Sequence, residues 1–202
     1  TSIRRTPWVN YGLVAANVFV FILPYFEGMM GRNALNATQA IRVWLGAGAL
    51  NGPDPQLYQF FTYQFLHANF AHLAGNMLFL WVFGNAVNAK MGHGPYLLFY
   101  LASGVFAAAG YSFSHSVTLV GASGSIAAVT GAFLALFPRS RITILYWFYI
   151  IGTFELPAVV MIVFKLILWD NILAPQMIGE SNVAFSAHLS GYALGFGATV
   201  LM

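Results

Sequence analysis

The hydrophobic residues of this 202-residue chain gather into six long runs, separated by stretches that hold most of the polar residues. Each run approaches the roughly 20 apolar residues that an α-helix needs to cross a bilayer. The pattern therefore predicts an all-α integral membrane protein, a bundle of six transmembrane helices that forms a single domain over 1–202. The expected helices cover about 8–26, 70–88, 95–113, 119–137, 154–170 and 184–202.

Two stretches depart from this simple pattern. The loop at 27–69 is too apolar and aromatic for a solvated linker, so we expect this long first loop to be partly embedded in the membrane. The apolar stretch at 142–169 is too long for one helix and is interrupted by Glu155 and Pro157. We expect residues 142–153 to lie at the cytoplasmic interface, before the fifth helix.

The composition supports a membrane protein. Hydrophobic residues make up 59% of the chain and charged residues only 6%, whereas about 25% of a soluble domain is charged. The net charge of +3 is too small and too dispersed to indicate nucleic-acid binding. Because the chain has no cysteine, disulfides, thiolate chemistry and cysteine-bound metals are excluded.

The distribution of lysine and arginine predicts an N-terminus in the cytoplasm, by the positive-inside rule. The chain would then have both ends inside and the loops at 27–69, 114–118 and 171–183 outside. Five basic residues fall on the inner side: Arg4, Arg5, Lys90, Arg139 and Arg141. The first residue is not methionine and the last run ends abruptly, so we expect trimmed termini. The lack of cysteine and of organellar targeting signals favours a multi-pass protein of the bacterial plasma membrane.

Polar side chains inside three of the expected helices are candidates for function, because such groups are costly in lipid. His72 and Asn76 are four residues apart and share one helical face, which also suits a hydrogen-bonded helix contact. Ser123 and His188 each stand beside a stripe of small residues, which equally suits plain packing. The stripes are Gly124, Ala128, Gly131 and Ala135 on one helix, and Ala184, Gly191, Gly195 and Ala198 on the other.

Two such stripes allow close helix packing, which would bring Ser123 and His188 together. A serine hydroxyl becomes a nucleophile when a histidine within hydrogen-bond reach takes its proton. His72 and Asn76 would add N–H donors for an oxyanion, together with the Ser123 amide at a helix start. No carboxylate lies on the face of His188, so we expect a Ser-His dyad in place of a triad.

The three motifs together resemble those of the rhomboid family of intramembrane serine proteases. The family's GxSG, HxxxN and AHxxG elements match Gly121–Gly124, His72–Asn76 and Ala187–Gly191, with Gly195 following. His67 matches a further histidine often found before HxxxN. Order and helix assignment also agree, so the resemblance covers essentially the whole chain.

The resemblance implies a serine endopeptidase that cleaves the transmembrane segments of single-pass membrane proteins near the outer surface. Ser123 would be the nucleophile and His188 the general base, while His72, Asn76 and the Ser123 amide would form the oxyanion hole. The fifth helix and the loop at 171–183 would gate substrate entry. Membrane lipids and transmembrane substrates are the implied partners, and no cofactor is expected. Further residues would shape the site: Gly121, Gly124, His67, Gly191 and Gly195.

Three other functions compete with this interpretation. The main alternative is a catalytically silent rhomboid-like protein that binds membrane clients, although such a chain would be expected to have lost its serine or histidine. A metal-dependent protein using His67, His72 and His188 lacks HExxH, cysteine and any nearby carboxylate, so no metal is expected. A transporter would show repeat symmetry and paired broken helices, and the sequence shows neither.

Overall fold

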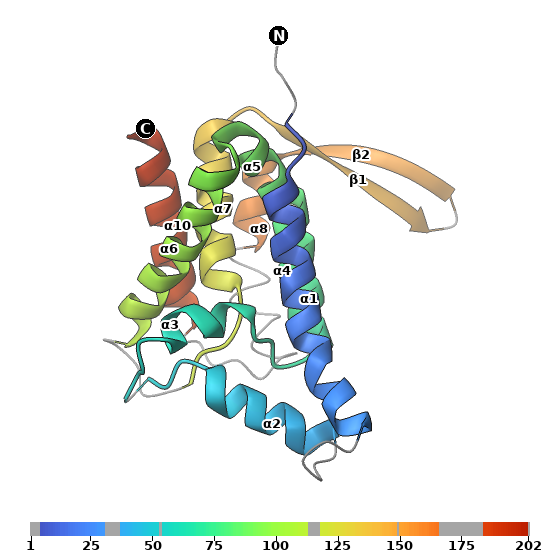
Figure 1. Ribbon diagram of the computed structural model, residues 1–202. Coiled ribbons are helices and arrows are strands. Elements are labelled where there is room, and N and C mark those ends of the chain that lie inside the picture. Colours follow the sequence, from blue (N-terminus) through green and yellow to red (C-terminus); the bar gives the residue numbers. More distant parts are fainter. Residues whose placement is uncertain are drawn as a thin grey trace.

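The computed structural model describes residues 5–30, 37–52, 54–112, 118–148, 150–165 and 184–201. Most of these residues are helical (Figure 1). The first half of the chain forms α1 (Trp8–Met29), α2 (Ala37–Gly48), α3 (Gln59–Thr62), the 3-10 turn η2 (Tyr63–Phe65), α4 (Phe70–Phe79), the π-turn η3 (Leu80–Gly84), α5 (Asn85–Met91) and α6 (His93–Ser112). The second half forms α7 (Ser123–Leu136), β1 (Arg141–Phe148), β2 (Ile150–Pro157), α8 (Ala158–Phe164) and α10 (Ala184–Val200).

Two of the described helices are long and apolar enough to cross a membrane. They are α1 and the continuous helix Phe70–Met91, which runs from α4 through η3 into α5. α7 is apolar but shorter. Helices also cover most of the expected segments 95–113 and 184–202. The count of six spans stays a prediction.

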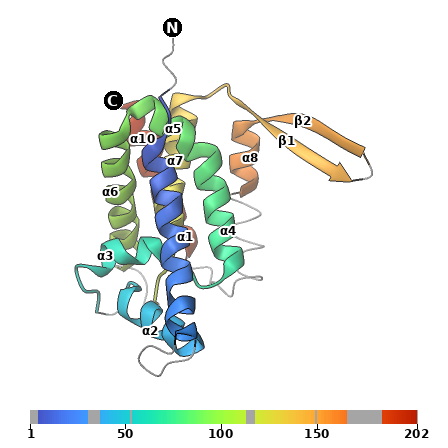
Figure 2. The same cartoon turned by 45° about the vertical axis from the view of Figure 1, so that its right-hand side comes forward.

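α7 forms the centre of the bundle. It is contacted by the α4–η3–α5 helix, by α6, by α8 and by α10, and every residue from Gly124 to Phe133 is buried. Many of these residues are glycine, alanine or serine, which lets the neighbouring helices approach closely. Figures 1 and 2 show both termini at one end of the bundle and the α2–α3 segment at the opposite end.

The stretch expected at the cytoplasmic interface is an antiparallel hairpin. β1 pairs with β2 from Arg141 opposite Pro157 to Phe148 opposite Ile150. The hairpin projects sideways from the bundle at the end that holds both termini (Figure 2). Its β-branched and aromatic residues favour strands.

The expected bounds of two helices were wrong. The fifth was expected from 154, but the chain is still in β2 there and the helix begins at Ala158, since Pro157 ends the strand and fits just before a helix. The remainder of the segment at 154–170 after Lys165 lies outside the described residues. The fourth was expected from 119, but α7 begins at Ser123 because Leu119 pairs with the first loop.

Candidate active site

His72 and Asn76 occupy the first turns of α4, and both are buried. The helix begins after Asn69, whose side-chain oxygen accepts a hydrogen bond from the backbone N–H of His72 at 2.9 Å. An asparagine cap of this kind fixes where a helix starts. The cap therefore holds His72 at the first turn, with Asn76 one turn further along the same face.

Gly121 brings the chain that leads into α7 directly against these two side chains. Its φ of +120° belongs to a backbone region that other residues rarely adopt. A Cβ atom at this position would lie 2.8 Å from Cε1 and Nε2 of His72 and 3.6 Å from Nδ2 of Asn76. Only glycine fits here, so His72, Asn76 and the backbone two residues before Ser123 form one cluster.

The first loop holds this backbone in place. Leu50 and Leu119 exchange two backbone hydrogen bonds of 3.0 and 2.9 Å, and the Gly121 N–H donates to the Tyr63 carbonyl at 2.9 Å. The Tyr63 hydroxyl in turn donates to the carbonyl of Gly104 on α6 at 2.7 Å. The backbone that leads to Ser123 is thus hydrogen-bonded to the first loop, and the first loop is in turn hydrogen-bonded to α6.

A second link joins the first loop to α7 itself. The hydroxyl of Ser125 donates to Oε1 of Gln64 at 2.9 Å, and both residues are buried. Neither Tyr63 nor Gln64 was among the residues chosen from sequence. The position of Gln64 between the aromatic residues Tyr63 and Phe65 was the available signal, because a buried amide needs partners.

Ser123 is the first residue of α7 and is half-buried. The N–H groups of a helix's first turn have no acceptor within the helix, and the helix dipole makes this end favourable for negative charge. A developing oxyanion beside Ser123 would therefore meet a suitable backbone environment.

α7 and α10 pack at backbone contact along their glycines. A Cβ on Gly191 would lie 2.7 Å from the carbonyl oxygen of Gly124, and one on Gly195 would collide with the backbone of Ala128. A Cβ on Gly131 would collide with the carbonyl of Tyr192. The packing of the two small-residue stripes, expected from the sequence, is thus found in the structure.

The order of these contacts shows where His188 lies on α10 relative to α7. Positions rise together along the two helices, from Gly124 with Gly191 to Ala128 with Gly195, so the helices run parallel. His188 lies about one turn before Gly191 and is therefore level with the start of α7. It is buried.

His67 lies in the segment between η2 and α4 and packs against His72. Its ring centroid is 5.2 Å from that of His72, with the two rings at 74°. Burial, and secondarily the neighbouring His72, lower the pKa of His67 to about 3. The imidazole is therefore neutral at physiological pH and serves as a packing partner of His72.

Some expected features lie beyond what the structure describes. The loop at 171–183, expected to gate the site, lies outside the described residues.

Among the residues that are described, no group of three histidine, aspartate or glutamate side chains is arranged to hold a metal ion.

Residues 54–202 match the family model of the Rhomboid domain. The chain is 39% identical over 118 residues to Rhomboid-like protein 11, chloroplastic, from Arabidopsis thaliana, an alignment that covers 57% of this chain and 38% of the relative. It is 46% identical over 70 residues to Rhomboid protease GluP from Bacillus subtilis (strain 168), covering 34% of this chain and 14% of that protein. The chain thus matches less than half the length of either relative. With its three motifs and this match over most of its length, the chain belongs to the rhomboid family.

Proposed function

We propose that this protein is an intramembrane serine endopeptidase of the rhomboid type, with Ser123 as nucleophile and His188 as general base. The observation that carries the proposal is the contact of Gly121 with His72 and Asn76. It sets two side-chain donors beside the backbone that leads to a serine at a helix start. Acyl-transfer chemistry needs donors near the nucleophile, because they stabilise the tetrahedral oxyanion.

The proposed reaction follows the logic of serine hydrolases. Ser123 Oγ attacks the scissile carbonyl carbon while His188 takes the hydroxyl proton. The carbonyl oxygen becomes an oxyanion that accepts hydrogen bonds from His72, Asn76 and the Ser123 amide. His188 then returns its proton to the leaving amine, and an acyl-enzyme forms. A water molecule, deprotonated by His188, hydrolyses that ester and restores Ser123.

The short length of α7 favours a substrate within the membrane. Its 14 residues span about 21 Å, whereas the hydrocarbon core is about 30 Å thick. At the other end of the helix, Pro138 and Arg139 follow within three residues of Leu136, so that end lies near an interface. Ser123 would then lie below the opposite surface, where the transmembrane segments of single-pass proteins are the available peptides.

The N-terminus would be cytoplasmic and the site would open to the outer side, in the bacterial plasma membrane. The α2–α3 segment lies at the end opposite the termini, which is compatible with this orientation (Figure 1). The fifth helix and the loop at 171–183 would admit the substrate. Catalysis would need neither a metal nor another cofactor.

Cleavage of a single-pass model substrate in proteoliposomes tests the proposal. We expect wild-type protein to cut near the outer end of the substrate helix, with EDTA having no effect. Ser123→Ala and His188→Ala should both abolish cleavage, while Ser112→Ala, whose hydroxyl donates to the Ala108 carbonyl of its own helix, should retain it. Substrate that co-purifies with folded wild-type protein yet stays intact would favour the alternative, a silent rhomboid-like protein that binds membrane clients.

A further inference from the structure

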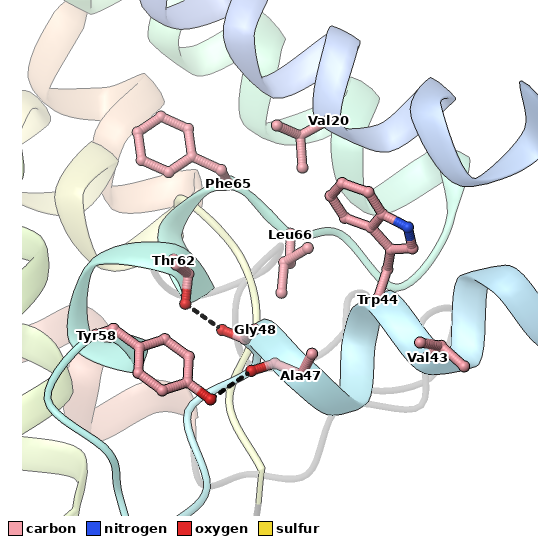
Figure 3. Close-up of a pocket in the computed structure, with 9 residues that line it drawn as sticks. All are labelled: Val20, Val43, Trp44, Ala47, Gly48, Tyr58, Thr62, Phe65 and Leu66. Carbon is pink, nitrogen blue, oxygen red and sulfur yellow. Dashed lines mark hydrogen bonds between the residues drawn. The ribbon is translucent and has the colours of Figure 1, made fainter. Parts of the chain in front are cut away.

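An apolar cavity of about 480 Å³ lies between α1, α2 and the segment from α3 to Leu66 (Figure 3), and its lining does not include Ser123. Val20 of α1 forms one wall, Trp44 and Ala47 of α2 form a second, and Phe65 and Leu66 form a third. The volume falls within the roughly 300–1,000 Å³ typical of sites for small ligands.

The polar groups around the cavity are already paired with the protein. Nε1 of Trp44 donates to Oε2 of Glu27 at 2.8 Å. The Tyr58 hydroxyl donates to the Ala47 carbonyl at 3.0 Å, and the Thr62 hydroxyl donates to the Gly48 carbonyl at 2.6 Å (Figure 3). These bonds leave little for a polar ligand to bind, and ordered water needs two or more polar partners. The lining therefore selects an apolar occupant.

The cavity is bounded by elements suited to lipid. α1 is one of the two described helices able to span a membrane, and on the faces turned away from the cavity it exposes Phe19 (63%) and Ile22 (40%). On the α2 wall, Val43 is 56% exposed. In a bilayer the molecules in contact with this surface are lipids. We propose that the cavity is a binding site for one acyl chain of a phospholipid from the surrounding membrane.

The bound chain stabilises the elements that support the candidate active site. Phe65 and Leu66 line the cavity, and the next residue is His67, whose ring packs against His72. Two residues before Phe65, the Tyr63 carbonyl holds the N–H of Gly121. An acyl chain packed against Phe65 and Leu66 thereby steadies both contacts. This second step rests on the proposed protease function, whereas lipid binding does not.

Lipid binding is tested by native mass spectrometry of the protein released from bilayers of phosphatidylcholine and phosphatidylglycerol. Val20→Phe and Ala47→Leu each fill the cavity from a different wall. The control, Val160→Phe, makes the same change at a 49%-exposed position of α8. We expect wild type and control to retain one phospholipid more than the filled variants, whose occupancy at that site should fall about tenfold, which corresponds to about 1.4 kcal/mol.

Equal lipid retention by wild type and both filled variants would overturn the proposal. So would a dimer mass in place of a protein–lipid adduct, because the cavity would then belong to a second copy. Fluorophosphonate labelling of Ser123 tests the support step separately. Loss of the lipid with slower labelling supports it, and loss of the lipid with unchanged labelling contradicts it. If wild type does not label at all, the protease proposal fails while the lipid count still decides the binding site.

Discussion

The contact between α7 and α10 and the region between α1 and α2 are packed in opposite ways. Between α7 and α10 the backbones touch, and an added Cβ at Gly195 would strike the backbone of Ala128. Between α1, α2 and the segment that follows α3, a cavity of about 480 Å³ is left open, lined by Val20 and Trp44 among others. Both regions are apolar, so hydrophobicity alone does not account for the difference.

The difference lies in side-chain size and in what each contact must fix. Small residues let helices meet at a single register, because any shift makes backbones collide. That register sets the height of His188 against Ser123. Large residues such as Trp44 and Phe65 instead line a space that a lipid chain can fill. We infer that precise packing is concentrated where the proposed chemistry needs it.

The largest effect should come from enlarging the close interface. Gly195→Val would press a branched side chain into the backbone of α7, and overpacking against backbone should cost about 3 kcal/mol or more. Gly197→Val is the matched control, since it makes the same change on α10 where a Cβ meets nothing within 4 Å. Thermal unfolding in detergent measures both. Equal melting temperatures for the two variants would show that the α7–α10 contact is not close.

The second-largest effect should come from replacing glycines that have a positive φ. Two such replacements separate the cost of backbone strain from the cost of crowding at the candidate site. Gly121→Ala and Gly92→Ala both force alanine into positive φ, of 120° and 90°, which costs about 1–3 kcal/mol. Only Gly121 faces His72, whereas Gly92 faces the flexible end of Arg5. We expect similar losses of stability but loss of proteolysis only in Gly121→Ala. Activity assays in proteoliposomes decide this, and equal activities would remove Gly121 from the site.

A smaller effect should follow from cutting the link between the first loop and α7. Ser125→Ala removes a buried hydrogen bond to Gln64, which should lower the free energy of unfolding by about 1–2 kcal/mol. Ser112→Ala removes a bond within its own helix and should cost less. Denaturation of the purified variants gives the difference. Complete loss of activity in a folded Ser125→Ala protein would assign Ser125 a chemical role that the account gives to Ser123.

The smallest effect should come from the region around the cavity between α1 and α2. Ala47→Leu extends into the cavity and should change the free energy of unfolding by less than about 0.5 kcal/mol. Ala128→Leu makes the same change at a fully buried position of α7 and should cost about 1–3 kcal/mol. Parallel unfolding curves test the pair. A destabilisation of Ala47→Leu as large as that of Ala128→Leu would erase the contrast between the regions.

Much of the helical layout could be predicted from sequence, because each helix is encoded locally by its own apolar run. The positions of α1 and of the helix Phe70–Met91 follow the pattern closely. The hairpin at 141–157 was missed because hydrophobic residues on both faces of a strand look like part of a long membrane helix. The run of three β-branched residues from Ile142 to Ile144 was the clue.

The candidate site, too, could be predicted from the sequence only in part. Glycine stripes predicted the contact of α7 with α10, since helical spacing puts them on one face. The roles of Ser123 and His188 rest on the motifs and stay predictions. The ties from Leu50 to Leu119 and from Tyr63 to Gly121 could not be predicted, because they join backbone atoms far apart in sequence. Backbone pairing of this kind leaves no signature in residue type.

Covalent labelling by a fluorophosphonate tests the central claim most directly, since only an activated serine reacts. Wild type, Ser123→Ala, His188→Ala and Ser125→Ala would be compared in detergent and in bilayers, with and without EDTA. We expect labelling of wild type and Ser125→Ala, none in Ser123→Ala or His188→Ala, and no effect of EDTA. Folded wild-type protein that remains unlabelled in both environments would contradict an activated Ser123 and leave a rhomboid that binds without cutting.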